Sequence, residues 1–170
     1  IKESPEEPRS VTITYEEGVP KEVDGIKDPV EMISYLNKVG GENGVGRIDI
    51  MEDGIMGLKS RELYEAPAAT VLLKTHADLE QLTLTKEQVR LKSEVDRMWA
   101  DMVYHAMWFN PLRRDLEAFI DSTQKHVNGK INLTLYKGNI NVTNRQSSDS
   151  LFAPELRSVK RGGFDQREST

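Results

Sequence analysis

The sequence predicts an α+β domain in which antiparallel hairpins flank a run of three helices. Two observations predict this class. Apolar and polar residues alternate near both ends of the chain, in 11–17 and 130–144, as is typical of strands. Between about 65 and 127, three consecutive segments repeat apolar residues at helical spacing.

The composition is typical of a soluble chain and argues against some classes of function. The 170 residues suit one domain or one large piece of a longer protein, with 37% hydrophobic and 30% charged residues. The net charge of −5 argues against nucleic-acid binding, which is driven by basic residues. No stretch is long and apolar enough to span a membrane, and no signal peptide is visible, so a cytoplasmic protein is expected.

Thiol and metal chemistry are not expected in this chain. It has no cysteine, which excludes disulfides, thiolate catalysis and cysteine-bound zinc. Its three histidines, His76, His105 and His126, show no metal-ligand spacing. The sequence therefore predicts no metal site.

The amino-terminal third predicts a linker, a hairpin and a helix. Residues 1–10 hold two prolines and little that could be buried, which favours a linker. A strand follows at 11–17, with a turn and a short return strand at 21–23. Asp28-Pro29 then opens a helix, because Asp can cap its first amides and Pro suits its first position.

The segment 48–59 predicts a second hairpin with a two-residue turn at Asp53-Gly54, since both positions of such a turn need positive φ. In that register the opposed pairs are Glu52 with Ile55, Ile50 with Gly57, and Ile48 with Lys59. Glu52 would extend an apolar row and lie at the margin of the core. The alternative is a solvated charge at a loop tip.

Helices and a final hairpin complete the chain. A helix is expected from Glu65 to about Leu82, a longer one capped by Thr85, and a third beginning at Pro111. The longer helix and the one after it have apolar residues expected to face the core: Leu91, Val95, Met98, Trp99, Met102, Val103, Ala106, Leu112, Leu116, Phe119 and Ile120. The alternation around 131–142 predicts two strands joined by a tight turn.

General catalytic motifs do not appear. The sequence has no nucleophile elbow, Walker loop or dinucleotide fingerprint, and the glycines of 40–46 read as a helix stop. Lys59 and Arg61 would share one strand face and could bind an anion, or could simply be solvated. Tyr64 could pack as an aromatic residue or donate a hydrogen bond to a ligand.

Several separated blocks resemble one enzyme family in the same order and spacing. The stretch "GVGRIDIMEDGIMGLKSRELYEAPAATVLL" at 44–73 resembles the carboxy-terminal synthetase region of argininosuccinate synthases. The similarity continues in "DMVYHAMWFNPLR" at 101–113, "LYKGN" at 135–139 and "RQSSDSLF" at 145–152, and "VTITYEEGVP" at 11–20 fits the strand that opens this region.

The resemblance implies a ligase of arginine biosynthesis that joins citrulline to aspartate at the expense of ATP. It implies that Glu52 and Tyr64 bind citrulline, with Lys59 and Arg61 near the site, and it assigns no catalytic residue to this chain. ATP and Mg would be bound by an amino-terminal domain that is absent here, so the chain alone is expected to be inactive.

The resemblance also sets the expected organisation. Residues 11–155 would form the synthetase domain, for citrulline binding and assembly into a homotetramer, and 156–170 would begin a carboxy-terminal tail. The chain begins with Ile1 and ends in a polar stretch, so we expect it to be cut from a longer polypeptide. Asp53-Gly54 replaces the Asn-Arg found in many members. The alternative function is a non-catalytic α+β interaction module on the same scaffold.

Overall fold

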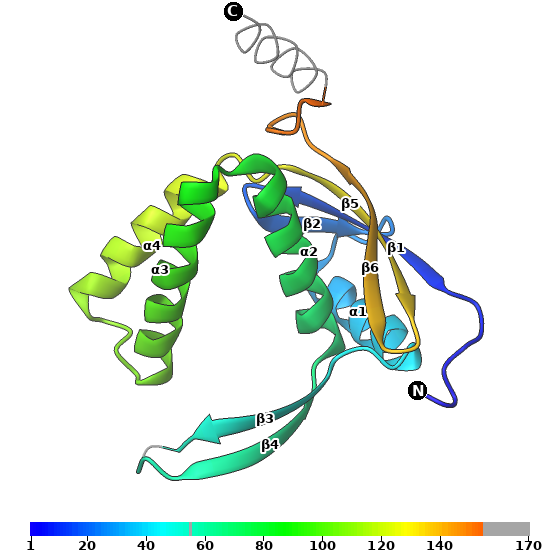
Figure 1. The fold of residues 1–170 in the computed structure, drawn as a ribbon, viewed down its shortest axis with the longest axis horizontal. Helices are drawn as coiled ribbons and strands as arrows, with labels where there is room; N and C mark the ends of the chain where they lie inside the picture. Colours follow the sequence, from blue (N-terminus) through cyan, green and yellow to red (C-terminus); the bar gives the residue numbers. More distant parts are fainter. Residues whose placement is uncertain (55, 155–170) are drawn as a thin grey trace, which may run out of the picture.

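The computed structural model describes residues 1–54 and 56–154, and these confirm the predicted α+β class (Figure 1). Strands and helices follow one another along the chain as β1 (Arg9–Glu16), β2 (Val19–Val23), α1 (Pro29–Glu42), β3 (Arg47–Asp53), β4 (Lys59–Glu65), α2 (Pro67–Thr83), α3 (Lys86–Tyr104), α4 (Pro111–Gln124), β5 (Gly129–Tyr136) and β6 (Asn139–Gln146). The predicted tail, 156–170, lies outside the described residues.

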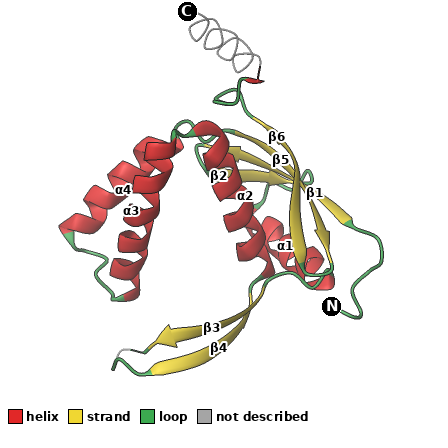
Figure 2. Ribbon diagram, in the orientation of Figure 1, coloured by secondary structure: helices red, strands yellow, loops and turns green. Residues whose placement is uncertain are grey.

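The first and last hairpins join into one antiparallel sheet, in the order β2-β1-β5-β6. Helices α1 and α2 cover one face of this sheet, as Figure 2 shows. Apolar side chains alternate along β1 and β5, so one set of them points at the helices. The resulting core contains Val11, Ile13, Tyr15, Val23, Met32, Leu36, Val39, Val71, Leu79, Ile131, Leu133 and Leu135.

The predicted linker packs against this body. Ser4 is 8% exposed, and the Lys137 ammonium bonds Glu6 at 2.6 Å. Arg9 and Ser10 already belong to β1. The amino-terminal segment therefore lies against the turn between β5 and β6, where Lys137 and Glu6 form an ion pair.

Two helix starts are fixed by the predicted caps. Asp28 accepts hydrogen bonds from the amides of Val30 and Glu31, at 3.0 and 2.9 Å, and begins α1. Thr85 and Gln88 form a reciprocal capping box at the start of α3. Both caps were predicted from the sequence and are confirmed.

Helices α3 and α4 pack on each other and project from the body as an arm (Figure 1). The prediction that Leu91, Met98 and Leu112 face a core is wrong, since their side chains are 54%, 53% and 46% exposed. Met102 and Leu116 are buried as predicted. Each helix of the arm has mainly the other to pack against, so part of its apolar stripe stays in solvent.

Tyr15 is the largest fully buried side chain of the core, and its hydroxyl lies 2.7 Å from Thr75 Oγ1. Burial raises the pKa of Tyr15 from 10.0 to about 12, because the charged phenolate would lose its hydration. The neutral phenol therefore stabilises the fold fully below pH 10, and this contribution is lost as pH rises through about 12.

Replacing Tyr15 with Phe is expected to remove that pH dependence and to destabilise the protein by about 1 kcal/mol at neutral pH, the value of a lost hydrogen bond. The wild-type protein should lose about 2 kcal/mol relative to the variant between roughly pH 9 and pH 12. Urea unfolding of both proteins across this range measures the difference, in which all other titrating groups cancel. Parallel pH profiles would contradict the assignment.

Strands β3 and β4 form a separate two-stranded sheet that extends away from the body (Figure 2). We call these strands and their connection, 47–65, the ribbon. Its two ends meet where the amide of Ala66 donates to the carbonyl of Gly46 at 2.9 Å. Among the described residues, no helix is long and apolar enough to cross a bilayer.

Candidate functional site

The ribbon carries every site residue that the sequence predicts, but in a different register. Asp53 lies opposite Lys59, and Glu52 lies opposite Ser60. The predicted two-residue turn and the three opposed pairs derived from it are therefore wrong, because the pairing of the two strands ends at Asp53 and Lys59. Positive φ occurs at Gly57, at +74°, and not at Gly54.

Backbone contacts explain the longer connection. The amide of Gly54 donates to Leu58 O at 2.8 Å, and the amide of Gly57 donates to Gly54 O at 2.8 Å. Gly57 supplies the left-handed position that closes this loop. The connection leaves Asp53 and Lys59 opposite one another, where their side chains form an ion pair.

One side of the ribbon, the front face, carries both residues that were predicted to bind citrulline. Alternation places six side chains on it: Ile48, Ile50, Glu52, Ser60, Glu62 and Tyr64. The Tyr64 hydroxyl donates to Glu52 Oε2 at 3.1 Å. Tyr64 lies opposite Ile48, four positions along β3 from Glu52, so both side chains must lie along the ribbon to meet.

The front face has negative character. Partial removal from water, the bond to Glu52 and the nearby Glu62 raise the pKa of Tyr64, so its phenol keeps the proton that it donates. Neither Glu52 nor Glu62 forms an ion pair with a basic side chain of the described residues. This face is therefore suited to a ligand that brings a positive charge.

On the opposite side, the back face, basic and acidic side chains pair with each other. Arg61 Nε and one of its terminal nitrogens donate to the two oxygens of Asp49, at 2.8 and 2.6 Å. This bond lowers the pKa of Asp49. Lys59 pairs with Asp53. The structure thus brings Glu52 and Tyr64 together and places Lys59 and Arg61 on the other face, engaged with carboxylates.

The ribbon does not lie beside the core, as the sequence suggested for Glu52. No described residue of 47–65 is buried, and Ile50 and Leu63 are 44% and 71% exposed. The ribbon contacts the body mainly at its root, so its apolar residues have no layer of the body to pack on. The sequence assigned no role to Asp49 or Glu62. With the correct register, alternation would have placed Asp49 on the face of Arg61 and Glu62 on the face of Glu52.

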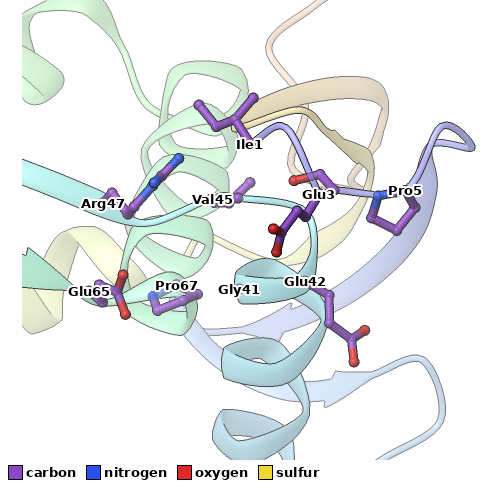
Figure 3. A pocket seen from close by; sticks show the side chains of 11 residues that line it. Ile1, Glu3, Pro5, Gly41, Glu42, Val45, Arg47, Glu65 and Pro67 are labelled. Atoms are coloured by element: carbon purple, nitrogen blue, oxygen red, sulfur yellow. The ribbon is translucent and has the colours of Figure 1, made fainter.

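A hollow lies at the root of the ribbon (Figure 3). Its volume is about 470 Å³, and its charged lining residues are Glu3, Glu42, Arg47 and Glu65. Glu52 and Tyr64 do not line it. Within 1–54 and 56–154, no group of three His, Asp or Glu side chains is arranged to hold a metal ion.

Comparison with known proteins identifies relatives of the whole chain. The family model described as "Arginosuccinate synthase C-terminal domain" matches residues 1–170. The argininosuccinate synthase of Methanopyrus kandleri is 54% identical over 165 residues, which are 97% of this chain and 42% of that protein. That of Methanococcus maripaludis is 48% identical over 93% of this chain and 40% of its own length. The argininosuccinate synthase of Pyrococcus furiosus is 46% identical over 98% of this chain and 41% of its own length. The chain therefore spans about two fifths of the length of these curated relatives.

Proposed function

This chain belongs to the argininosuccinate synthase family, as its carboxy-terminal domain, and we propose that it supplies the citrulline-binding surface of an ATP-dependent carbon–nitrogen ligase. The complete enzyme would join citrulline and aspartate into argininosuccinate, with release of AMP and pyrophosphate, in arginine biosynthesis. The reaction would form one C–N bond, and cleavage of ATP to AMP and pyrophosphate would drive it.

The observation that supports this role is the front face of the ribbon. Glu52 and Tyr64 meet there at 3.1 Å, on a surface without a basic partner among the described residues. Citrulline is a zwitterion whose α-ammonium group is positive and whose ureido end is neutral. Glu52 would pair with the ammonium group. The phenol of Tyr64 would hold the Glu52 carboxylate in place or form a hydrogen bond with a polar group of citrulline.

The remaining chemistry would belong to the rest of the polypeptide. The ureido oxygen of citrulline would attack the α-phosphate of ATP and expel pyrophosphate, and the aspartate amine would then displace AMP from the citrullyl-adenylate. ATP, its Mg and aspartate would bind in the amino-terminal domain, and the chain by itself would be inactive.

A product assay on the full polypeptide tests the proposal. With citrulline, aspartate, ATP and magnesium, argininosuccinate and AMP are expected in equal amounts by mass spectrometry. Citrulline labelled with oxygen-18 in the ureido group should pass the label to AMP, since that oxygen attacks phosphorus. The chain 1–170 serves as the control and should give neither product.

Each outcome has a distinct meaning. Unlabelled AMP would contradict the adenylate route but not the citrulline site. A folded full-length protein that forms neither product would overturn the proposal and leave a non-catalytic interaction module, which the family match does not favour.

We further propose that the enzyme is a cytoplasmic homotetramer and that the tip of the α3–α4 arm contacts a second copy. The tip exposes Tyr104, Trp108 and Phe109 at 65%, 48% and 84%. Aromatic residues of this kind are enriched in protein interfaces, and these three expose roughly 400 Å² if each has about 200 Å² to bury. Sedimentation velocity of the full polypeptide gives the mass of the assembly, and a monomer at micromolar concentration would contradict the proposal.

A further inference from the structure

The back face of the ribbon holds one contact that crosses the two strands obliquely. Arg61 lies directly opposite Met51, and Asp49 lies directly opposite Leu63. The Arg61–Asp49 bond therefore joins positions two residues out of register. Both carboxylate oxygens take part, at 2.8 and 2.6 Å, so the planar guanidinium fixes direction as well as distance.

The ribbon has little else to set its shape. A two-stranded sheet without a core is marginal in water, and its twist varies more than that of a wide sheet. No described residue of 47–65 is buried, so packing against the rest of the molecule constrains the twist only weakly. Contacts between the two strands must set it.

The Glu52–Tyr64 contact on the front face depends on that twist. The two residues are separated by four positions of register, and the hydroxyl reaches the carboxylate only because both side chains extend along the ribbon. A change in twist accumulates over this separation. It would move the hydroxyl relative to the carboxylate far more than it would move a directly opposed pair.

We infer that Asp49 and Arg61 are positioning residues for the citrulline site: their oblique bidentate bond on the back face holds the twist at which Tyr64 meets Glu52 on the front face. The inference rests on the proposed function. Neither residue would touch a citrulline bound to Glu52, because both lie on the opposite face of the ribbon. This assigns Arg61 a role different from anion binding.

Lys59 and Asp53 provide the matched comparison on the same face. They also form an ion pair, but they are directly opposite each other and next to the 54–58 connection. Such a pair is less sensitive to twist than an oblique one, and an ammonium group does not define direction as a guanidinium group does. Loss of this pair should not disturb the front face.

The first test is kinetic and uses the full polypeptide. Asp49→Asn and Arg61→Met are each expected to raise the citrulline KM about fivefold to tenfold, comparable to the loss of one well-placed hydrogen bond, with the ATP KM within about twofold of wild type. Lys59→Met, the control, should leave both constants within about twofold. The exchanged pair, Asp49→Arg with Arg61→Asp, should restore the citrulline KM to within about threefold of wild type.

A second readout does not depend on turnover. The bond to Glu52 contributes to the raised pKa of Tyr64, so this pKa should fall towards that of an ordinary tyrosine in Asp49→Asn and remain unchanged in Lys59→Met. Carbon-13 NMR of labelled tyrosine, with Tyr64→Phe to assign the signal, measures it. An unchanged Tyr64 pKa in Asp49→Asn would show that the two faces are not coupled.

The outcomes separate this inference from the proposed function. If Glu52→Gln raises the citrulline KM while Asp49→Asn and Arg61→Met do not, only the positioning role is overturned. If the single variants are impaired and the exchanged pair is not restored, Arg61 acts in some other way and the inference is again wrong. If Glu52→Gln leaves the citrulline KM unchanged, the citrulline site itself fails.

Discussion

Replacing Glu52 with Gln in the full enzyme is expected to raise the citrulline KM about tenfold to a hundredfold and to leave the ATP KM nearly unchanged. Glutamine keeps the shape of the side chain and can still accept the hydrogen bond from Tyr64. It loses the negative charge that would pair with the citrulline α-ammonium group, and a hydrogen bond to a charged group contributes about 1.5–3 kcal/mol. Steady-state kinetics with each substrate varied in turn measures the effect.

Two variants on the same face are controls for Glu52→Gln. Glu62→Gln removes a carboxylate that has no bond to Tyr64 among the described residues, so its effect should be small and should report only the general negative potential. Tyr64→Phe removes one hydroxyl and should raise the citrulline KM about threefold to tenfold. If Glu52→Gln raised the citrulline KM and the ATP KM equally, the role assigned to Glu52 would be wrong.

Replacing Gly46 with Ala is expected to be the most destabilising small substitution at the root of the ribbon, with a loss of about 3 kcal/mol or more in the free energy of unfolding. Gly46 has φ of +90°, and a Cβ there would lie 2.4 Å from Pro67 Cα and 2.5 Å from Pro67 N. These are backbone atoms at the start of α2, so they cannot rotate away as a side chain can. Urea unfolding measures the loss.

Gly25 is the matched control for Gly46. Its φ of +87° is nearly the same, but no atom lies within 4 Å of the Cβ position. Gly25→Ala should therefore cost only the backbone strain, about 1 kcal/mol. A similar loss in both variants would show that the close approach to Pro67 is unimportant.

The parts of the fold that the sequence predicts well are those determined by local interactions. Asp28 and Thr85 cap their helices with their own side chains, so a few neighbouring residues decide where α1 and α3 begin. The alternation in β1 and β5 is complete because one face of each strand is buried. The α+β class follows from these patterns.

The ribbon shows where local signals fail. The dipeptide Asp-Gly occurs twice, and at Asp24-Gly25 both residues have positive φ, 47° and 87°. At Asp53-Gly54 neither does, and Gly57 supplies the left-handed position instead. The dipeptide permits a tight turn in both places, but the pairing of the flanking strands decides whether one forms. For this reason the sequence predicted Glu52 and Tyr64 through family resemblance, and not through their register.

The exposed apolar residues of the arm have a related explanation. Helical spacing shows that Leu91, Met98 and Leu112 lie on apolar stripes, and both helices exist as predicted. Periodicity reports that a face is apolar, and it does not report what covers that face. In this chain the two helices meet mainly each other, which leaves these side chains 54%, 53% and 46% exposed.

The bond between Ala66 and Gly46 at the root has a consequence for how the protein's folding is measured. This bond joins the two ends of the ribbon, and β3 and β4 share no sheet with the other strands. Residues 47–65 can therefore unfold as a cooperative unit of their own while the rest remains folded. Amide hydrogen exchange should be fast in β3 and β4 and slow in β1 and β5. Thermal melting reports the unfolding of the larger unit. A screen based on melting temperature would therefore accept ribbon variants that have lost the proposed citrulline site.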